Sequence, residues 1–511
     1  MKPYKTFLFL ISVLAVVSLS AFLLRNYGLA SAFSPENEKD LFNRLQKENI
    51  RQQDSLTRLV NHLYNLDTTL FFYETLQETP YSYFEYDTNL ERTPLYPFYY
   101  QLLSLKDTGN FLKTTQEVEV LSDYAEYTTS SLYSNKFIRI LHYGDSQIEN
   151  DHITSTIRSF LQTAFGGNGK GMLPLFQTYY TGPVHIRKFG DWQIKTLKKN
   201  SRKGNYGLCN SYLYPPPITA LIESKTKTYG NIQIKLENSF IEKNNRPLFL
   251  QALVHEEVSK QDMELRVNKT KVLSTQQCLS SFGLKRYDWA LPSTTEELSL
   301  RMCFLKNRNI YALSINDTTG ICVDNLPVRG SAGEIFLQNN RRFLIDNYAL
   351  MNVGLVIYQF GVNAIPQDPS KIMPNYDYYE RLLYQELIYL RILMPNTPII
   401  VVGISDRSRK KGLSFETNPN VLEVRKAQKQ AALKAGCVYW DLFSTMGGNN
   451  SMQKWVDRTP SLAMKDYIHF NDKGSELVGK MFYKSLINDY RKFLITEKKK
   501  KLADVSATFT K

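Results

Sequence analysis

Four short apolar runs in the sequence have the length and composition of buried β-strands. They are rich in β-branched and aromatic residues, and they cover residues 137–143, 353–360, 397–404 and 437–442. Residues 378–393 and 421–435, which separate the later runs, have apolar side chains at helical spacing. Strands that alternate with helices in this way are typical of a parallel sheet with helices on both faces. The pattern therefore predicts an α/β fold with a parallel sheet as its central layer.

Between residues 176 and 318 the spacing of apolar residues changes to a period of two. Residues 232–236 and 298–302 alternate between apolar and polar side chains, and Asn, Lys, Gly and Pro separate such stretches. Short alternating segments bounded by turn residues are the pattern of antiparallel strands. We therefore expect a β-sandwich over 176–318, inserted between the two parts of the α/β domain at 136–175 and 319–495.

A predominantly apolar segment stands close to the N-terminus, at residues 7–24, after Lys2 and Lys5. It is longer than the apolar core of a usual signal peptide, about 7–15 residues, and close to the roughly 20 residues that span a bilayer. Ala30-Ser31-Ala32 matches the small-residue pattern of signal cleavage sites. Residues 1–32 are therefore predicted to be a signal peptide or a membrane anchor. Because the lysines precede the apolar run, the rest of the chain is expected to be exported to the cell envelope or periplasm.

Two further segments lack the pattern of a packed core. Residues 33–135 begin with a polar, helix-forming stretch and continue with a region rich in Tyr, Phe and Pro. We interpret them as a helical stalk followed by an adaptor that packs on the α/β domain. Residues 496–511 contain the run Lys498–Lys501 and are predicted to be a basic, disordered tail.

Composition narrows the functional classes. The chain has 511 residues, 43% of them hydrophobic and 22% charged, which excludes a wholly disordered or polytopic membrane protein. Its five cysteines include no CxxC pair, which excludes a zinc ribbon and a disulfide-stapled scaffold. The net charge is +14, and basic runs such as residues 407–411 suit either a solvated surface or attraction to an anionic envelope polymer. Nucleic acid is not expected as a partner of an exported chain, and the oligomeric state is left open.

Candidate chemistry first appears where the strand at 137–143 ends. The next residues are Gly144-Asp145-Ser146, and apolar residues at helical spacing follow. This order places Ser146 at the carboxyl end of a strand and beside a helix N-terminus, where backbone N–H groups favour negative charge. The tripeptide by itself is also a common turn, so it does not establish a catalytic serine.

Acidic and histidine side chains cluster around this turn, but without the spacing of a metal site. His142, Asp151 and His152 match no HExxH or comparable pair of ligands. We expect His142 to form hydrogen bonds in the core, and Asp151 and His152 to lie on a helix surface. No metal and no cofactor is predicted.

Three further segments, together with Gly144-Asp145-Ser146, complete an ordered set of motifs. They are Val328-Arg329-Gly330-Ser331-Ala332-Gly333, Gly361-Val362-Asn363 at the end of the strand at 353–360, and Asp466-Tyr467-Ile468-His469. In this order and on these elements, the four segments resemble the blocks of the SGNH, or GDSL-like, hydrolase family. The resemblance implies the flavodoxin-like, three-layer α/β/α fold of that family.

The resemblance also implies roles for five residues. Ser146 matches the nucleophile, with His469 as its general base and Asp466 as the carboxylate that fixes the His469 tautomer. The oxyanion hole would consist of the Ser146 and Gly330 backbone N–H groups and the Asn363 side-chain amide. These residue types suit acyl transfer, because a neutral imidazole can remove the serine proton near neutral pH.

The position of the insert narrows the resemblance to one subgroup. An SGNH domain with a β-sandwich after its first block is similar to bacterial peptidoglycan O-acetylesterases, whose insert resembles carbohydrate-binding modules. Gln147 and Pro327 depart from that subgroup, which often has histidine and glycine at these places. The implied function is a serine esterase that removes O-acetyl groups from an envelope glycan. An O-acyltransferase supplied by a membrane-bound acyl-donor partner, and a non-catalytic glycan-binding protein, stay open as alternatives.

Overall fold

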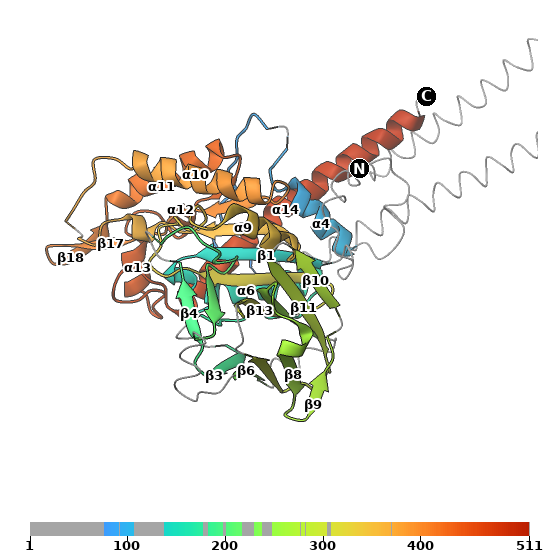
Figure 1. Ribbon diagram of the computed structural model, residues 1–511. Coiled ribbons are helices and arrows are strands. Elements are labelled where there is room, and N and C mark those ends of the chain that lie inside the picture. The colour runs from blue at the N-terminus through green and yellow to red at the C-terminus, as the bar shows by residue number, and fades with distance from the viewer. Residues whose placement is uncertain are drawn as a thin grey trace, which may run out of the picture. The chain divides into compact units, whose positions relative to one another are not determined.

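The structure of the protein is a computed structural model (Figure 1), and its described residues all belong to one compact unit, Phe72–Lys511. The described residues are 76–90, 92–106, 137–176, 182–197, 201–216, 229–237, 248–275, 277–281, 283–303, 308–368 and 370–509. The predicted signal or anchor segment, residues 1–32, lies outside this part of the chain. Within the described ranges, no helix combines the length and the apolar character needed to cross a bilayer.

Five parallel strands in the described chain form the sheet that carries the motifs. Their order is β14-β1-β15-β16-β19, and every neighbouring pair is parallel. The strands are β1 (Phe137–Gly144), β14 (Gly320–Pro327), β15 (Val353–Gln359), β16 (Ile399–Val402) and β19 (Val438–Trp440). The predicted α/β fold with a parallel sheet is thus confirmed, and β14 is added to it at one edge.

Helices cover both faces of this sheet. Neighbouring side chains of β1 point in opposite directions, so Leu141 belongs to one hydrophobic cluster and Ile140 to another. The first cluster includes side chains of α9 (Arg341–Ala349), α10 (Asp377–Leu393) and α11 (Asn420–Lys434). The second includes side chains of α4 (Tyr96–Lys106), α6 (His152–Phe165), α13 (Ser451–Asp457) and α14 (Asp472–Phe509). The short helix α12 (Leu442–Thr445) follows β19.

The described part of the expected adaptor contacts the α/β layers. Phe98 and Leu102 of α4 are fully buried in the second cluster. Glu85 and Tyr439 exchange two backbone hydrogen bonds, of 2.8 and 2.7 Å, so this segment adds a bridge beside β19.

Two antiparallel sheets occupy the segment in which a β-sandwich is predicted. One has the strand order β10-β11-β7-β13-β5-β4, with β2 paired to β13, and the other has the order β3-β6-β12-β8-β9. Inward side chains such as Leu250 and Ile234 form a third hydrophobic cluster. The bounds are β2 (Gly171–Met172), β3 (Val184–Phe189), β4 (Gln193–Thr196), β5 (Ser211–Tyr214), β6 (Tyr229–Leu236), β7 (Leu248–His255), β8 (Met263–Val267), β9 (Lys271–Leu273), β10 (Gln277–Ser281), β11 (Leu284–Leu291), β12 (Glu297–Cys303) and β13 (Ile310–Asn316). The boundaries of a separate domain stay a prediction.

A buried ion pair joins the parallel sheet to the first antiparallel sheet. Arg139 of β1 donates to Asp324 of β14 and to the Gln251 side chain of β7, and all three side chains are buried. The Asp324 carboxylate also accepts from the backbone N–H of Met172 in β2, at 2.8 Å. Because a buried charge is tolerated only when it is paired and hydrogen-bonded, these contacts fix how the two sheets meet.

The C-terminal segment is helical where a disordered tail is expected. Helix α14 continues to Phe509 and thus through most of residues 496–511. The segment contains Lys, Glu, Leu and Ala, which have high helix propensity and extend the preceding helix. The structure therefore corrects the expected tail to a helix as far as Phe509.

Candidate active site

The turn after β1 presents Ser146 at the carboxyl edge of the parallel sheet. Asp145 caps a short 3₁₀ helix, Ser146–Ile148, by accepting a 3.0 Å hydrogen bond from the Gln147 backbone N–H. At Gly144 a Cβ atom would lie 2.8 Å from the Ile148 side chain and 2.9 Å from the Gln359 carbonyl oxygen, so only glycine fits this turn. The α-helix expected directly after Ser146 begins later, at His152.

The three residues of the expected triad lie in one hydrogen-bonded line. Ser146 Oγ is 2.8 Å from His469 Nε2, and His469 Nδ1 is 2.7 Å from Asp466 Oδ2. The other Asp466 oxygen accepts from the backbone N–H groups of Ile468 and His469, at 2.9 and 3.0 Å. The carboxylate is therefore fixed by its own loop, and it fixes the imidazole with Nε2 directed at the serine.

The Asp466 carboxylate makes His469 a stronger base. The hydrogen bond to Asp466 raises the pKa of His469 above its usual 6.5, although partial burial opposes the shift. Partial burial alone would raise the pKa of Asp466, but hydrogen bonds from His469 and Ile468 outweigh it and lower that pKa to about 2. Asp466 thus stays a carboxylate at the pH where His469 titrates.

The residues expected to form the oxyanion hole come from the two strands beside β1. Gly330 follows β14 with a φ of +78° and open space around it, and the nearby Val328 N–H donates to Gly144 O at 2.7 Å. Asn363 follows β15, on a 3₁₀ turn at Val362–Ala364, and its amide donates to Ser331 O at 3.0 Å. Within the part of the chain that the structure describes, neither the Ser146 nor the Gly330 backbone N–H donates to another residue. Both stay available to an oxyanion, and their catalytic role stays a prediction.

Gln147 holds the nucleophile turn to the histidine loop. Its side-chain amide donates to Ser405 Oγ at 2.8 Å and to the Ile468 carbonyl oxygen at 3.2 Å. In the sequence, Gln147 stands out only as a departure from the subgroup pattern. Two signals in the sequence could have indicated a role at the site. Gln147 directly follows the candidate nucleophile, and Ser405 comes shortly after a strand.

One interpretation of residues 407–411 places them on a solvated basic surface. Arg407 does not fit it, because this side chain contacts the loop that carries Asn363. The half-buried guanidinium donates to the Val362 carbonyl oxygen at 3.0 Å, and it also reaches the Ile365 and Pro366 carbonyl oxygens, at 3.5 Å. A guanidinium has five donors in a rigid plane, so it can hold several carbonyl groups of one loop together. Arg407 thereby supports the turn that carries Asn363.

A hairpin next to Arg407 contacts the loop that carries Asp466 and His469. It consists of β17 (Ser408–Lys411) and β18 (Ser414–Thr417), and the Ser408 N–H donates to the Tyr467 carbonyl oxygen at 3.1 Å. The Phe415 and Tyr467 rings stack with centroids 3.6 Å apart. Tyr467 stands between Asp466 and His469, so the hairpin braces the loop that holds both.

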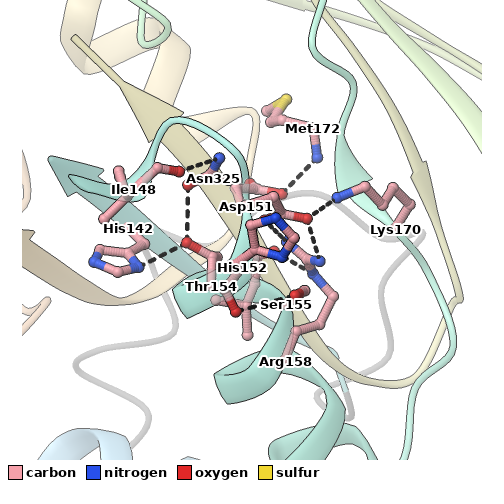
Figure 2. Close-up of polar contacts among 12 residues, drawn as sticks. His142, Ile148, Asp151, His152, Thr154, Ser155, Arg158, Lys170, Met172 and Asn325 are labelled. Atoms are coloured by element: carbon pink, nitrogen blue, oxygen red, sulfur yellow. Dashed lines mark hydrogen bonds and ion pairs between the residues drawn. The ribbon is translucent and has the colours of Figure 1, made fainter. Parts of the chain in front are cut away.

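The polar cluster behind the nucleophile turn is a set of buried hydrogen bonds (Figure 2). His142 bonds to the Thr154 hydroxyl at 2.9 Å, Thr154 donates to Asn325 at 2.8 Å, and Asn325 donates to the Ile148 carbonyl oxygen at 3.0 Å. Burial lowers the pKa of His142 to about 4, so this imidazole is neutral near pH 7. His142 thus forms core hydrogen bonds, as expected from the sequence, and the cluster supports the end of the Ser146 turn.

Asp151 is buried, which corrects the expectation that it lies on a helix surface. It accepts two hydrogen bonds from Arg158, at 2.9 and 3.0 Å, and a further one from Lys170 (Figure 2). Burial alone would raise the pKa of Asp151, but these two cations outweigh it and lower that pKa to about 2. His152 does remain partly exposed, where it pairs with Asp472 at 3.2 Å. Among the described residues, no group of three or more His, Cys, Asp or Glu side chains could hold a metal ion.

Comparison with known proteins bears on the fold. No protein-family model matches this sequence, and no curated protein matches it either. A solved structure of a peptidoglycan O-acetylesterase matches 73% of this chain and 96% of its own, with a TM-score of 0.54 and 20% sequence identity. This chain has the fold of a peptidoglycan O-acetylesterase. The resemblance to SGNH hydrolases that the motifs indicate is thereby confirmed as a likeness of fold.

Weaker matches include two further carbohydrate esterases. An acetyl xylan esterase matches 32% of this chain and 80% of its own at 16% identity, with a TM-score of 0.24. A family two carbohydrate esterase from Cellvibrio japonicus matches 60% of this chain and 98% of its own at 9% identity, with a TM-score of 0.20.

We expect Asp466 to control the titration of His469. Asp466→Asn should lower the pKa of His469, because it replaces the carboxylate that stabilises the imidazolium with a neutral amide. A reaction that needs neutral His469 should gain rate as pH rises through this pKa, so the acid limb of its pH profile should move to lower pH in the variant. NMR titration of the imidazole measures the shift directly. Asp472→Asn, which removes the partner of His152, is the control, and an equal shift in both variants would contradict the assignment.

We expect Arg407 to position the Asn363 turn. Arg407→Ala should lower kcat for an aryl acetate about ten-fold or more with little change in KM, because a misplaced oxyanion donor affects the transition state more than substrate binding. Arg407→Lys should recover part of the rate, since it restores a donor to the Val362 carbonyl oxygen. Arg381→Ala, at an exposed position of α10, is the control for a lost surface charge. A folded Arg407→Ala protein with unchanged kcat would exclude this role.

Proposed function

We propose that the protein is a serine esterase that removes O-acetyl groups from an envelope polysaccharide, with peptidoglycan as its substrate. The observation that carries the proposal is the continuous line of hydrogen bonds from Ser146 through His469 to Asp466. This line stands at the carboxyl edge of a parallel sheet, which is where open α/β sheets bind their ligands. The candidate oxyanion donors Gly330 and Asn363 follow the two strands next to β1.

The first half of the reaction forms an acetyl-enzyme. Ser146 Oγ attacks the acetyl carbonyl carbon while His469 Nε2 accepts the hydroxyl proton. The carbonyl oxygen becomes an oxyanion that accepts hydrogen bonds from the Ser146 and Gly330 backbone N–H groups and from the Asn363 amide. His469 then gives its proton to the sugar oxygen, the bond between that oxygen and the acetyl carbon breaks, and acetyl-Ser146 remains.

The second half is hydrolysis. Water gives a proton to His469 and attacks the acetyl carbon. His469 then returns this proton to Ser146 Oγ as the bond between Oγ and the acetyl carbon breaks, which releases acetate and restores the Ser146 hydroxyl. The side chains of His469 and Asp466 are 33% and 43% exposed, so bulk water can approach the base. An acyltransferase must hold a sugar hydroxyl in line and keep water out, normally under a covering segment. The exposure of the triad therefore favours hydrolysis over transfer to a glycan.

The choice of glycan follows from the likeness of fold. The match to the peptidoglycan O-acetylesterase extends over 96% of that protein, so it includes more than the catalytic sheet. A shared architecture of catalytic and antiparallel sheets supports a similar polymeric substrate. Acetylated peptidoglycan is therefore the first substrate to test.

Ser146→Ala should abolish acetate release from acetylated peptidoglycan and from 4-nitrophenyl acetate, with a loss of about 1,000-fold or more. The melting temperature should change little, because the side chain is small and partly exposed. Ser159→Ala, at an exposed position of α6, is the matched control and should keep the full rate.

The same assay separates the alternatives. Acetate is the product expected of an esterase, also when chito-oligosaccharide is present at low concentration. Acetyl groups recovered mainly on that sugar would replace the esterase with an acyltransferase. A wild-type protein that releases no acetate from either substrate would favour a non-catalytic glycan-binding protein.

We also propose that the catalytic residues lie outside the cytoplasmic membrane, since Lys2 and Lys5 precede the apolar residues 7–24. Protease added to intact spheroplasts should digest the domain that contains Ser146, while a cytoplasmic marker protein survives. Complete protection of the domain, with digestion after lysis, would contradict an external location.

A further inference from the structure

The sheet β3-β6-β12-β8-β9 has one apolar face and one polar face. Alternate residues such as Ile232, Ile234 and Leu300 are fully buried in the third hydrophobic cluster. Their neighbours in the sequence are exposed or half-buried and point away from the cluster. The outward face is therefore open to a ligand, and its residues follow from the strand register.

Strand pairing arranges the outward side chains in rows across four strands. Phe189 of β3 lies opposite Asn231 of β6, which lies opposite Arg301 of β12, and Arg301 lies opposite Glu264 of β8. In the next row, Gln233, Ser299 and Arg266 are opposite one another in the same way. Tyr229 is two residues before Asn231 and thus on the same face.

These rows line a groove of about 820 Å³. Phe189 and Tyr229 are 49% and 43% exposed, so two aromatic rings on this face are accessible to a ligand. Arg301 stacks on the Tyr229 ring, 4.1 Å from its centroid, and keeps that ring in place. The Ser299 hydroxyl bonds to Asn231 at 2.8 Å, and Arg266 pairs with Glu264 at 2.6 Å, so the polar side chains are also held in defined positions.

The chemistry of this lining matches a sugar chain. A pyranose ring has an apolar C–H face, which packs on the electron-rich face of an aromatic ring, and a rim of hydroxyl groups, which bond to amide and hydroxyl side chains. The groove has two aromatic rings beside Asn231, Gln233 and Ser299. Two arginines against one glutamate give it a net positive charge, which suits a glycan that carries carboxylates. A protein partner would need a wider apolar centre than two rings provide.

We propose that this groove, separate from the Ser146 site, binds a strand of the wall glycan and holds the polymer near the esterase. The volume lies in the range of ligand sites, roughly 300–1,000 Å³, which leaves room for a few sugar residues. The choice of peptidoglycan as the glycan rests on the proposed function. The groove increases the local concentration of acetylated polymer without taking part in the chemistry.

The test uses the full chain with Ser146→Ala, so that binding is measured without turnover. Co-sedimentation with purified peptidoglycan sacculi gives the affinity of this parent protein. Adding Tyr229→Ala or Phe189→Ala should weaken binding about ten-fold or more, because each change removes a stacking surface. Tyr378→Ala removes an aromatic side chain that is 73% exposed on α10, and it should bind as the parent does.

Activity measurements keep this proposal distinct from the proposed function. With Ser146 intact, both groove variants should hydrolyse 4-nitrophenyl acetate at the wild-type rate, which also shows that they are folded, and should release acetate from sacculi more slowly. Groove variants that bind sacculi as tightly as the parent, or no more weakly than the Tyr378→Ala control, would contradict the proposal that the groove binds glycan. A wild-type protein that binds sacculi through the groove but releases no acetate would contradict the proposed esterase activity. The proposal that the groove binds glycan would still hold.

Discussion

The pairing of β1 with β14 on one side and β15 on the other is the constraint on which the candidate site depends. The three strands are parallel and adjacent, so their carboxyl ends meet at one edge. Ser146, Gly330 and Asn363 each follow the end of one of these strands, although the first and last are separated by more than two hundred residues. Buried side chains cover both faces of the sheet, and a slip of one residue in any strand would exchange the side chains that pack in the two clusters. Packing thereby fixes the positions of the candidate catalytic side chains.

The loops beyond the sheet need support of their own, and polar contacts supply it. Gln147 connects the nucleophile turn to the loop of His469, and Arg407 holds the turn of Asn363 through backbone carbonyl groups. Asn325 contacts the nucleophile turn from within the sheet. Near the start of β1, the Arg139–Asp324 pair joins the parallel sheet to the antiparallel sheet that contains Gln251. The antiparallel part is thus attached through buried charges as well as through apolar packing, and this attachment fixes its position relative to the parallel sheet.

Much of the fold and of the candidate site could be predicted from the sequence. Apolar runs predicted four of the five described parallel strands, and period-two alternation indicated the antiparallel segment. The fifth strand, β14, lacks a continuous apolar run because its interior contains Asp324 and Asn325. Both side chains are buried and form hydrogen bonds. The order of Gly144–Ser146, Gly361–Asn363 and Asp466–His469 indicated which side chains would meet. Such motifs are local in the sequence, and each stands at the end of an element whose type the sequence reveals.

The sequence by itself determined the elements and the residue types of the candidate triad, because periodicity and turn chemistry act between near neighbours in the chain. Only the tertiary structure decided which distant residues support them. Arg407 belongs by sequence to a basic run, and it became a support for Asn363 only because β15 and β16 are adjacent in the sheet. Asp151 was expected on a surface, yet Arg158 and Lys170 enclose it. The groove residues of β3, β6, β12 and β8 are likewise brought into rows by strand register, which depends on the burial of the opposite face and cannot be read from any one strand.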